Sequence, residues 1–116
     1  MPAIRIPLIV LRILAAVQIT LGIAFWAGHW YTLVGLHRMG GVLFVVTLWV
    51  IALMALRAKR AIGLGVFALA WGVVVAALGF AQQRLLIGDL HWIVRVAHLV
   101  IAMCAMPLAE RLARDA

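Results

Sequence analysis

The sequence predicts an all-α integral membrane protein, a single transmembrane domain over residues 1–116 that folds as an up-down bundle of four helices. Hydrophobic residues make up 69% of the chain, charged residues 11%, and the mean hydropathy is +1.25. Water-soluble domains differ strongly, because about a quarter of their residues are charged. Four apolar runs, each close to the roughly 20 residues that a helix needs to cross a bilayer, fill almost the whole chain.

Each expected helix follows from one apolar run that ends at charged or glycine-containing residues. The runs are Ile6 to Trp26, Met39 to Leu56, Ala61 to Ala81 and Leu90 to Leu108. With their flanking residues, the runs predict helices over residues 5–28, 32–58, 61–85 and 89–112. The connections between these helices are short, so consecutive helices should be antiparallel neighbours.

Basic residues are shared unequally between the two ends of the predicted bundle. One end has Arg5, Arg12, Arg57, Lys59, Arg60, Arg111 and Arg114, and the other has Arg38, Arg84 and Arg95. Because basic residues accumulate on the cytoplasmic side, both termini are expected in the cytoplasm, with the chain in a bacterial inner membrane. The net charge of +7 is then a topology signal and an attraction to anionic lipid, and no nucleic-acid partner is expected.

A short motif occurs twice and predicts two pseudo-repeated helical hairpins. The first copy is Leu21-Gly22-Ile23-Ala24, followed by His29-Trp30 and His37, and the second is Leu78-Gly79-Phe80-Ala81, followed by His91-Trp92 and His98. The repeat equates His37 with His98. Counting residues from the cytoplasmic charges would instead place His98 deeper than His37 by about 12 Å, and we give the repeat more weight.

His37 and His98 are the candidate cofactor ligands. An ionisable side chain inside a membrane span indicates a functional site, and neutral imidazole is a common axial ligand of haem iron. Two such ligands on different helices can hold one haem between them. Gly40 and Gly41 follow His37 by one turn and are expected to clear the same helix face for the ring. Arg38 and Arg95 are expected to pair with the propionates of the haem, because Arg is the better donor for carboxylates.

The residues around both histidines resemble a known family. Leu36-His37-Arg38-Met39-Gly40, which opens an apolar helix that closes at Arg57, resembles the second helix of bacterial inner-membrane b-type cytochromes. Those four-helix proteins hold haem b between histidines and exchange electrons with quinone. The stretch from Arg95 to Ile101, followed by Pro107, is similar to another histidine-bearing helix of that group. The resemblance implies haem-ligand roles for His37 and His98 only, and an activity as an electron carrier or quinone-linked oxidoreductase.

The resemblance covers two of the four helices. The chain is much shorter than those cytochromes, and its first helix has no histidine at its cytoplasmic start. One haem b is therefore the expected cofactor, rather than two, and quinone is the expected exchange partner.

His29 and His91 form a second candidate site at the outer interface, where the neighbouring Trp30 and Trp92 are expected to lie. This pair is suited to a divalent metal, a second cofactor or a quinone headgroup. Only Asp89 lies nearby as a carboxylate, so no zinc or di-iron set is complete. Hydrolytic catalysis is set aside, because the chain contains no Ser.

Two other functions stay open. A small accessory or assembly subunit of a larger membrane complex would also be short and would need no cofactor. Four-helix transporters of this length rely on a carboxylate within the first helix, where this chain has only Gln18 and Thr20 as polar groups. The stripe Gly65, Gly72 and Gly79 indicates a close helix contact, which is usually packing within the bundle; it also offers a face for a second copy, and we expect a homo-oligomer or a larger membrane complex.

Overall fold

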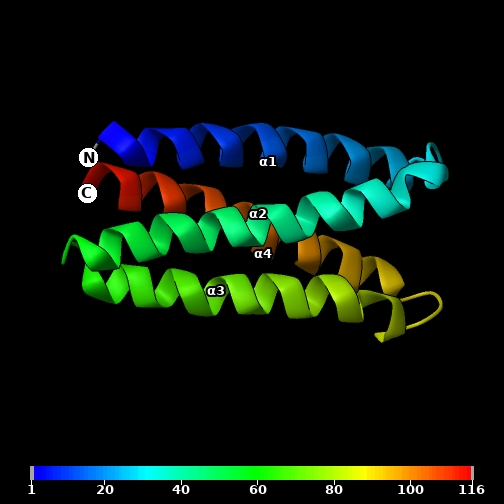
Figure 1. Cartoon of the computed structure of the whole chain (residues 1–116). Coiled ribbons are helices and arrows are strands. Elements are labelled where there is room, and N and C mark those ends of the chain that lie inside the picture. The colour runs from blue at the N-terminus through cyan, green and yellow to red at the C-terminus, as the bar shows by residue number, and fades with distance from the viewer. Residues whose placement is uncertain (1, 116) are drawn as a thin grey trace.

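A computed structural model describes residues 2–115 and consists of four long antiparallel helices. These are α1 (Arg5–Trp26), α2 (Val34–Arg57), α3 (Ile62–Ala81) and α4 (His91–Asp115), with short 3₁₀ turns at Pro2–Ile4, Tyr31–Leu33 and Gln82–Arg84. Both termini and the α2–α3 connection lie at one end of the bundle, which we call the inner end (Figure 1). The α1–α2 and α3–α4 connections lie at the outer end. The predicted all-α four-helix bundle is confirmed.

The expected helix bounds agree with the structure to within four residues. The largest difference is at the end of α3, which stops at Ala81 because the 3₁₀ turn Gln82–Arg84 follows it. Both outer connections contain a glycine in the left-handed region, Gly28 with φ +86° and Gly88 with φ +104°. Glycine adopts this backbone conformation without a steric penalty, so each outer connection can reverse the chain within a few residues.

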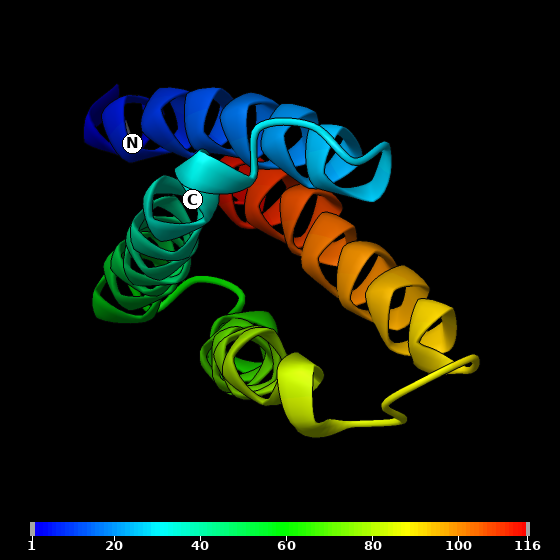
Figure 2. The ribbon, with the colours of Figure 1, turned by 90° about the vertical axis from the view of Figure 1, so that its right-hand side faces the viewer.

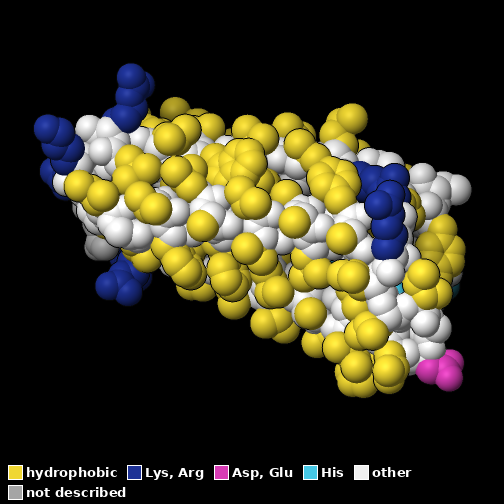
Figure 3. All heavy atoms as spheres, turned by 90° about the horizontal axis from the view of Figure 1, so that it is seen from below, with side chains coloured by type: hydrophobic (Ala, Val, Ile, Leu, Met, Phe, Trp, Pro, Cys, Tyr) yellow, Lys and Arg dark blue, Asp and Glu magenta, His cyan; other side chains and the backbone are white. Residues whose placement is uncertain are grey.

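The exposed sides of the four helices form the surface of a multi-pass membrane protein. All four helices are long and apolar enough to cross a membrane, and large hydrophobic side chains such as Ile13, Phe67 and Val73 are more than half exposed. Hydrophobic side chains cover the middle of the visible face, with Lys and Arg near its two ends (Figure 3). A surface of this kind is stable in lipid and would aggregate in water.

The tightly packed core occupies the inner half. Leu11, Leu48, Ile51 and Leu112 are completely buried there, one from α1, two from α2 and one from α4. The alanines of this region are also fully covered; they are Ala52, Ala55, Ala68, Ala105 and Ala109. Small residues let helix backbones approach closely, so α2 packs against each of the other three helices.

The glycine stripe of α3 faces the inside of the bundle. Gly65 and Gly72 are buried; a Cβ on Gly65 would lie 2.9 Å from the Leu56 side chain, and a Cβ on Gly72 would overlap the Trp49 indole. Gly65 and Gly72 therefore serve packing within one chain, and the homo-oligomer stays a prediction. The small residues serve the contact between α2 and α3 within one chain, which uses the same close approach.

One side-chain interaction joins each of four neighbouring helix pairs. They are Gln18 to the His37 carbonyl (2.7 Å, α1–α2), Trp49 to the Leu69 carbonyl (3.0 Å, α2–α3), Trp71 to the Ile101 carbonyl (2.8 Å, α3–α4), and the ion pair of Arg12 with Glu110 (2.6 and 2.7 Å, α1–α4). Such interhelical bonds stabilise membrane helices by about 0.6 kcal/mol on average. They also fix how each helix is rotated about its own axis.

Candidate functional site

His37 and His98 line the same cavity in the outer half of the bundle. Its volume is about 350 Å³, and residues from all four helices contribute to its wall. His37 comes from the first turn of α2 and His98 from the second turn of α4. The structure thus brings together the two histidines that the repeat equates.

In both copies of the repeat, the glycine of the Leu-Gly motif lies next to the histidine of the following helix. A Cβ on Gly22 of α1 would lie 3.9 Å from the Cε1 atom of His37, and a Cβ on Gly79 of α3 would lie 3.3 Å from the Cε1 atom of His98. In each hairpin the glycine of the first helix therefore packs against the imidazole of the second. The repeated Leu-Gly motif is a packing motif, and the packing is closer at Gly79 than at Gly22.

One ring nitrogen of each histidine has no hydrogen-bond partner within the described residues. The Nδ1 atoms of His37 and His98 are buried and have no hydrogen-bond partner there. The His37 ring also meets Phe25 edge to face, with 5.3 Å between ring centroids. A buried polar atom normally finds a partner. Each Nδ1 atom therefore has unused hydrogen-bonding capacity within the described residues, and both rings lie at the wall of a cavity that a ligand could occupy.

The predicted neighbours of the histidines are only partly on the cavity wall. Arg38, Arg95 and Gly41 line the cavity. Gly40 is absent from its wall, because the Gln18 side chain lies against it: a Cβ on Gly40 would be 2.5 Å from the Gln18 Oε1 atom. The glycine pair therefore clears space chiefly for an amide side chain.

His29 and His91 have different surroundings. His29 is exposed in the α1–α2 connection and does not line the cavity. His91 lines it and has its Nδ1 atom 3.1 Å from the Leu85 carbonyl oxygen. Within residues 2–115, no group of three or more His, Cys, Asp or Glu side chains is placed to hold a metal ion.

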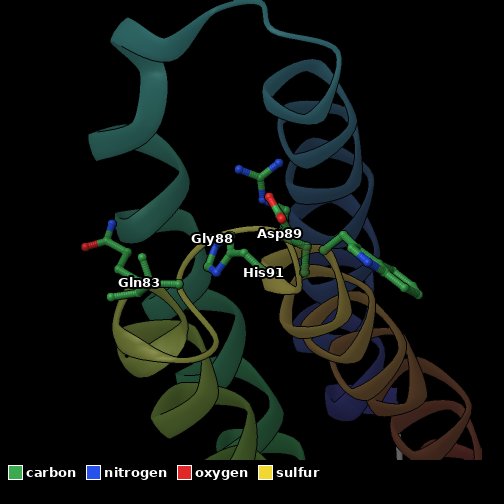
Figure 4. Close-up of a pocket in the computed structure, with 7 residues that line it drawn as sticks. Gln83, Gly88, Asp89 and His91 are labelled. Atoms are coloured by element: carbon green, nitrogen blue, oxygen red, sulfur yellow. The ribbon is translucent and has the colours of Figure 1, made fainter.

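A second pocket of about 380 Å³ adjoins the histidine cavity at the outer end (Figure 4). Its wall consists of Gln83, Ile87, Gly88, Asp89, His91, Trp92 and Arg95. Gln83, His91 and Arg95 also line the histidine cavity, so the two spaces share one wall. The pocket offers an amide, a carboxylate, an imidazole and a guanidinium beside an indole, which suits a small amphipathic molecule.

Sequence reasoning did not assign Gln18 or Phe25 to the site, although both line the cavity. A signal for Gln18 was present, because an amide within an apolar span seeks a polar partner. Phe25 has no comparable signal, since it is one apolar residue in a helix made of apolar residues.

No protein-family model, no curated protein and no solved structure matches the chain. The histidine cavity and the sequence motifs are accordingly the grounds for assigning a function.

Proposed function

We propose that the chain is a membrane b-type cytochrome, which binds one haem b between His37 and His98 and transfers single electrons. One observation carries the proposal: two imidazoles from separate halves of the chain line a single cavity, and the Nδ1 atom of each is buried without a hydrogen-bond partner in the described residues. Its volume of about 350 Å³ lies within the range of roughly 300–1,000 Å³ that is typical of ligand pockets.

The wall of the cavity supports this assignment. Arg38 and Arg95 line it together with the histidines and can each donate two hydrogen bonds to a propionate. Phe44, Val45 and Leu99 provide apolar wall, which excludes water and adjusts the reduction potential. When bound, haem b supplies an iron that accepts and releases one electron.

The distribution of charge supports a bacterial inner membrane with the inner end in the cytoplasm, because seven of the ten basic residues belong to that end. The histidine cavity then lies in the half of the bilayer away from the cytoplasm. The adjoining pocket opens at the outer interface, where Gln83, Asp89 and His91 offer hydrogen bonds to a quinone headgroup. Quinol or quinone is the exchange partner that we assign to it.

The transporter alternative is disfavoured by the pairing of Glu110. A proton-coupled exporter needs a carboxylate that is free to exchange its proton within the membrane, and Glu110 is the carboxylate that the described spans contain. Both of its oxygens accept hydrogen bonds from Arg12, at 2.6 and 2.7 Å. A two-bond pair of this kind stabilises the charged carboxylate.

The reduced-minus-oxidised visible spectrum of the detergent-purified protein tests the proposal. The wild type should give a sharp b-type band, and His37→Ala and His98→Ala should each lose it while retaining their helical circular dichroism. His29→Ala is the matched control, because His29 is exposed and does not line the cavity, and it should keep the band. A colourless wild type from cells that supply haem would overturn the proposal and favour an accessory subunit without a cofactor.

A further inference from the structure

The two halves of the histidine site differ at several positions of the repeat, and one of these positions lies directly against His37. Gln18 precedes Gly22 by four residues, and Val75 precedes Gly79 by four residues, so the repeat equates Gln18 with Val75. Both side chains line the cavity. An amide on the His37 side thus stands where the His98 side has an apolar residue, and the symmetry of the two hairpins is broken there.

Gln18 is held directly against the backbone of His37. Its Nε2 atom donates a hydrogen bond of 2.7 Å to the His37 carbonyl oxygen. A Cβ on Gly40 would lie 2.5 Å from the Gln18 Oε1 atom, and a Cβ on Gly41 would lie 3.2 Å from its Nε2 atom. Gly40 and Gly41 therefore leave space on α2 for the Gln18 amide. An added Cβ at either position would press against this amide, more strongly at Gly40.

The other end of the amide has no partner among the described residues. The Oε1 atom of Gln18 is buried and makes no hydrogen bond there. A carbonyl oxygen carries partial negative charge, and its field is weakly screened in an apolar interior. The equivalent Val75 provides no such dipole, so the electrostatic environments of the two histidines differ.

We propose that Gln18 is a positioning residue for His37. It fixes the backbone that carries this imidazole and brings a buried carbonyl oxygen against α2 one turn after His37, with no counterpart at Val75, so the two histidines act as non-equivalent ligands. This inference rests on the proposed haem site. It predicts that the amide favours the more positive ferric state and thereby lowers the reduction potential.

Gln18→Met tests the inference, because methionine has nearly the same length and lacks both the donor and the carbonyl. The midpoint potential, measured by redox titration of the b-type band, should rise, and the g values in the electron paramagnetic resonance spectrum should change as the His37 ring reorients. Thr20→Val is the matched control. The Thr20 hydroxyl donates only to the Ala16 carbonyl in its own helix and is exposed, so this variant should keep the wild-type potential and g values.

Gly40→Ala displaces the amide without changing Gln18 itself. Its Cβ would require the Gln18 side chain to move, and the same upward shift of the potential is expected. Gly35→Ala is the control on the same helix, because nothing lies within 4 Å of its Cβ position. Loss of the haem band in Gln18→Met with intact helicity also supports a positioning role, provided that Thr20→Val keeps the band.

Different results would contradict the positioning role of Gln18 and the proposed haem site. If Gln18→Met and Gly40→Ala bind haem with wild-type potentials and g values, the positioning role is wrong and the haem site stands. If the wild type binds no haem, the proposed function itself is wrong.

Discussion

The inner and outer halves of the bundle contain the same four helices but are packed in different ways. In the inner half, Leu11, Leu48, Ile51 and Leu112 are completely buried. In the outer half, side chains of all four helices surround a cavity of about 350 Å³. Viewed from the outer end, α4 diverges from α3 toward the connection that joins them (Figure 2). Packing that stabilises the fold and groups that can bind a ligand therefore occupy different depths of the same bundle.

This separation has a simple physical origin. Alanines at the inner contacts let the backbones approach, and their side chains are fully covered at Ala52, Ala105 and Ala109. Imidazole and guanidinium groups are larger than a methyl group, so helices that carry them cannot approach to the same distance. Stability should accordingly depend on the inner half, and ligand binding on the outer half.

The largest effect on stability should come from truncating an inner leucine. Leu48→Ala removes a completely buried side chain and should lower the free energy of unfolding by about 2–5 kcal/mol, as large-to-small core substitutions do. Leu99→Ala removes a side chain that already lines the outer cavity, so it should cost about 1 kcal/mol or less. Reversible unfolding in mixed micelles, followed by circular dichroism, measures both. Equal losses would contradict the division between the two halves.

A smaller effect is expected at the contact between α2 and α3. Gly72→Ala would force the Trp49 indole to move and to release the Leu69 carbonyl, so it should destabilise the fold by about 1–3 kcal/mol, as overpacking does. Gly63→Ala on the same helix has nothing within 4 Å of its Cβ position and should be neutral or slightly stabilising. The same unfolding assay compares them. A neutral Gly72→Ala would mean that α2 and α3 are less closely packed than the structure shows.

Composition and run length were sufficient to predict the membrane fold. With 69% hydrophobic residues and four runs of spanning length, a four-helix membrane protein was the expected result. The repeat equated His37 with His98, and both line one cavity in the structure.

The rotation of each helix about its own axis was harder to predict than the number and length of the helices. α1 is apolar around most of its circumference, so the sequence did not indicate which face meets α2, and the bond from Gln18 to His37 was not foreseen. The glycine stripe of α3 was interpreted both as packing within the bundle and as a face for a second copy, and its Gly65 and Gly72 pack against α2. Small residues indicate close approach, but they do not indicate whether the neighbour belongs to the same chain.

The smallest effect is expected from alanine substitutions at Gly22 and Gly79, the glycines that lie next to His37 and His98 in the outer half. A Cβ on Gly79 would lie 3.3 Å from the Cε1 atom of His98, whereas a Cβ on Gly22 would lie 3.9 Å from that of His37. The first distance is tighter than ordinary packing and requires the ring to move slightly, and the second is a normal contact. Gly79→Ala should therefore shift the b-type band or weaken haem retention with little change in stability, and Gly22→Ala should do neither.

Visible spectra and unfolding curves of the two alanine variants decide this comparison. A loss of stability in Gly79→Ala as large as that in Leu48→Ala would show that the outer half also carries the fold. Identical spectra in both variants would mean that the two glycine contacts are equivalent in spite of their different distances. The asymmetry of the site would then arise from polar groups such as Gln18, which matches the apolar Val75 in the other hairpin.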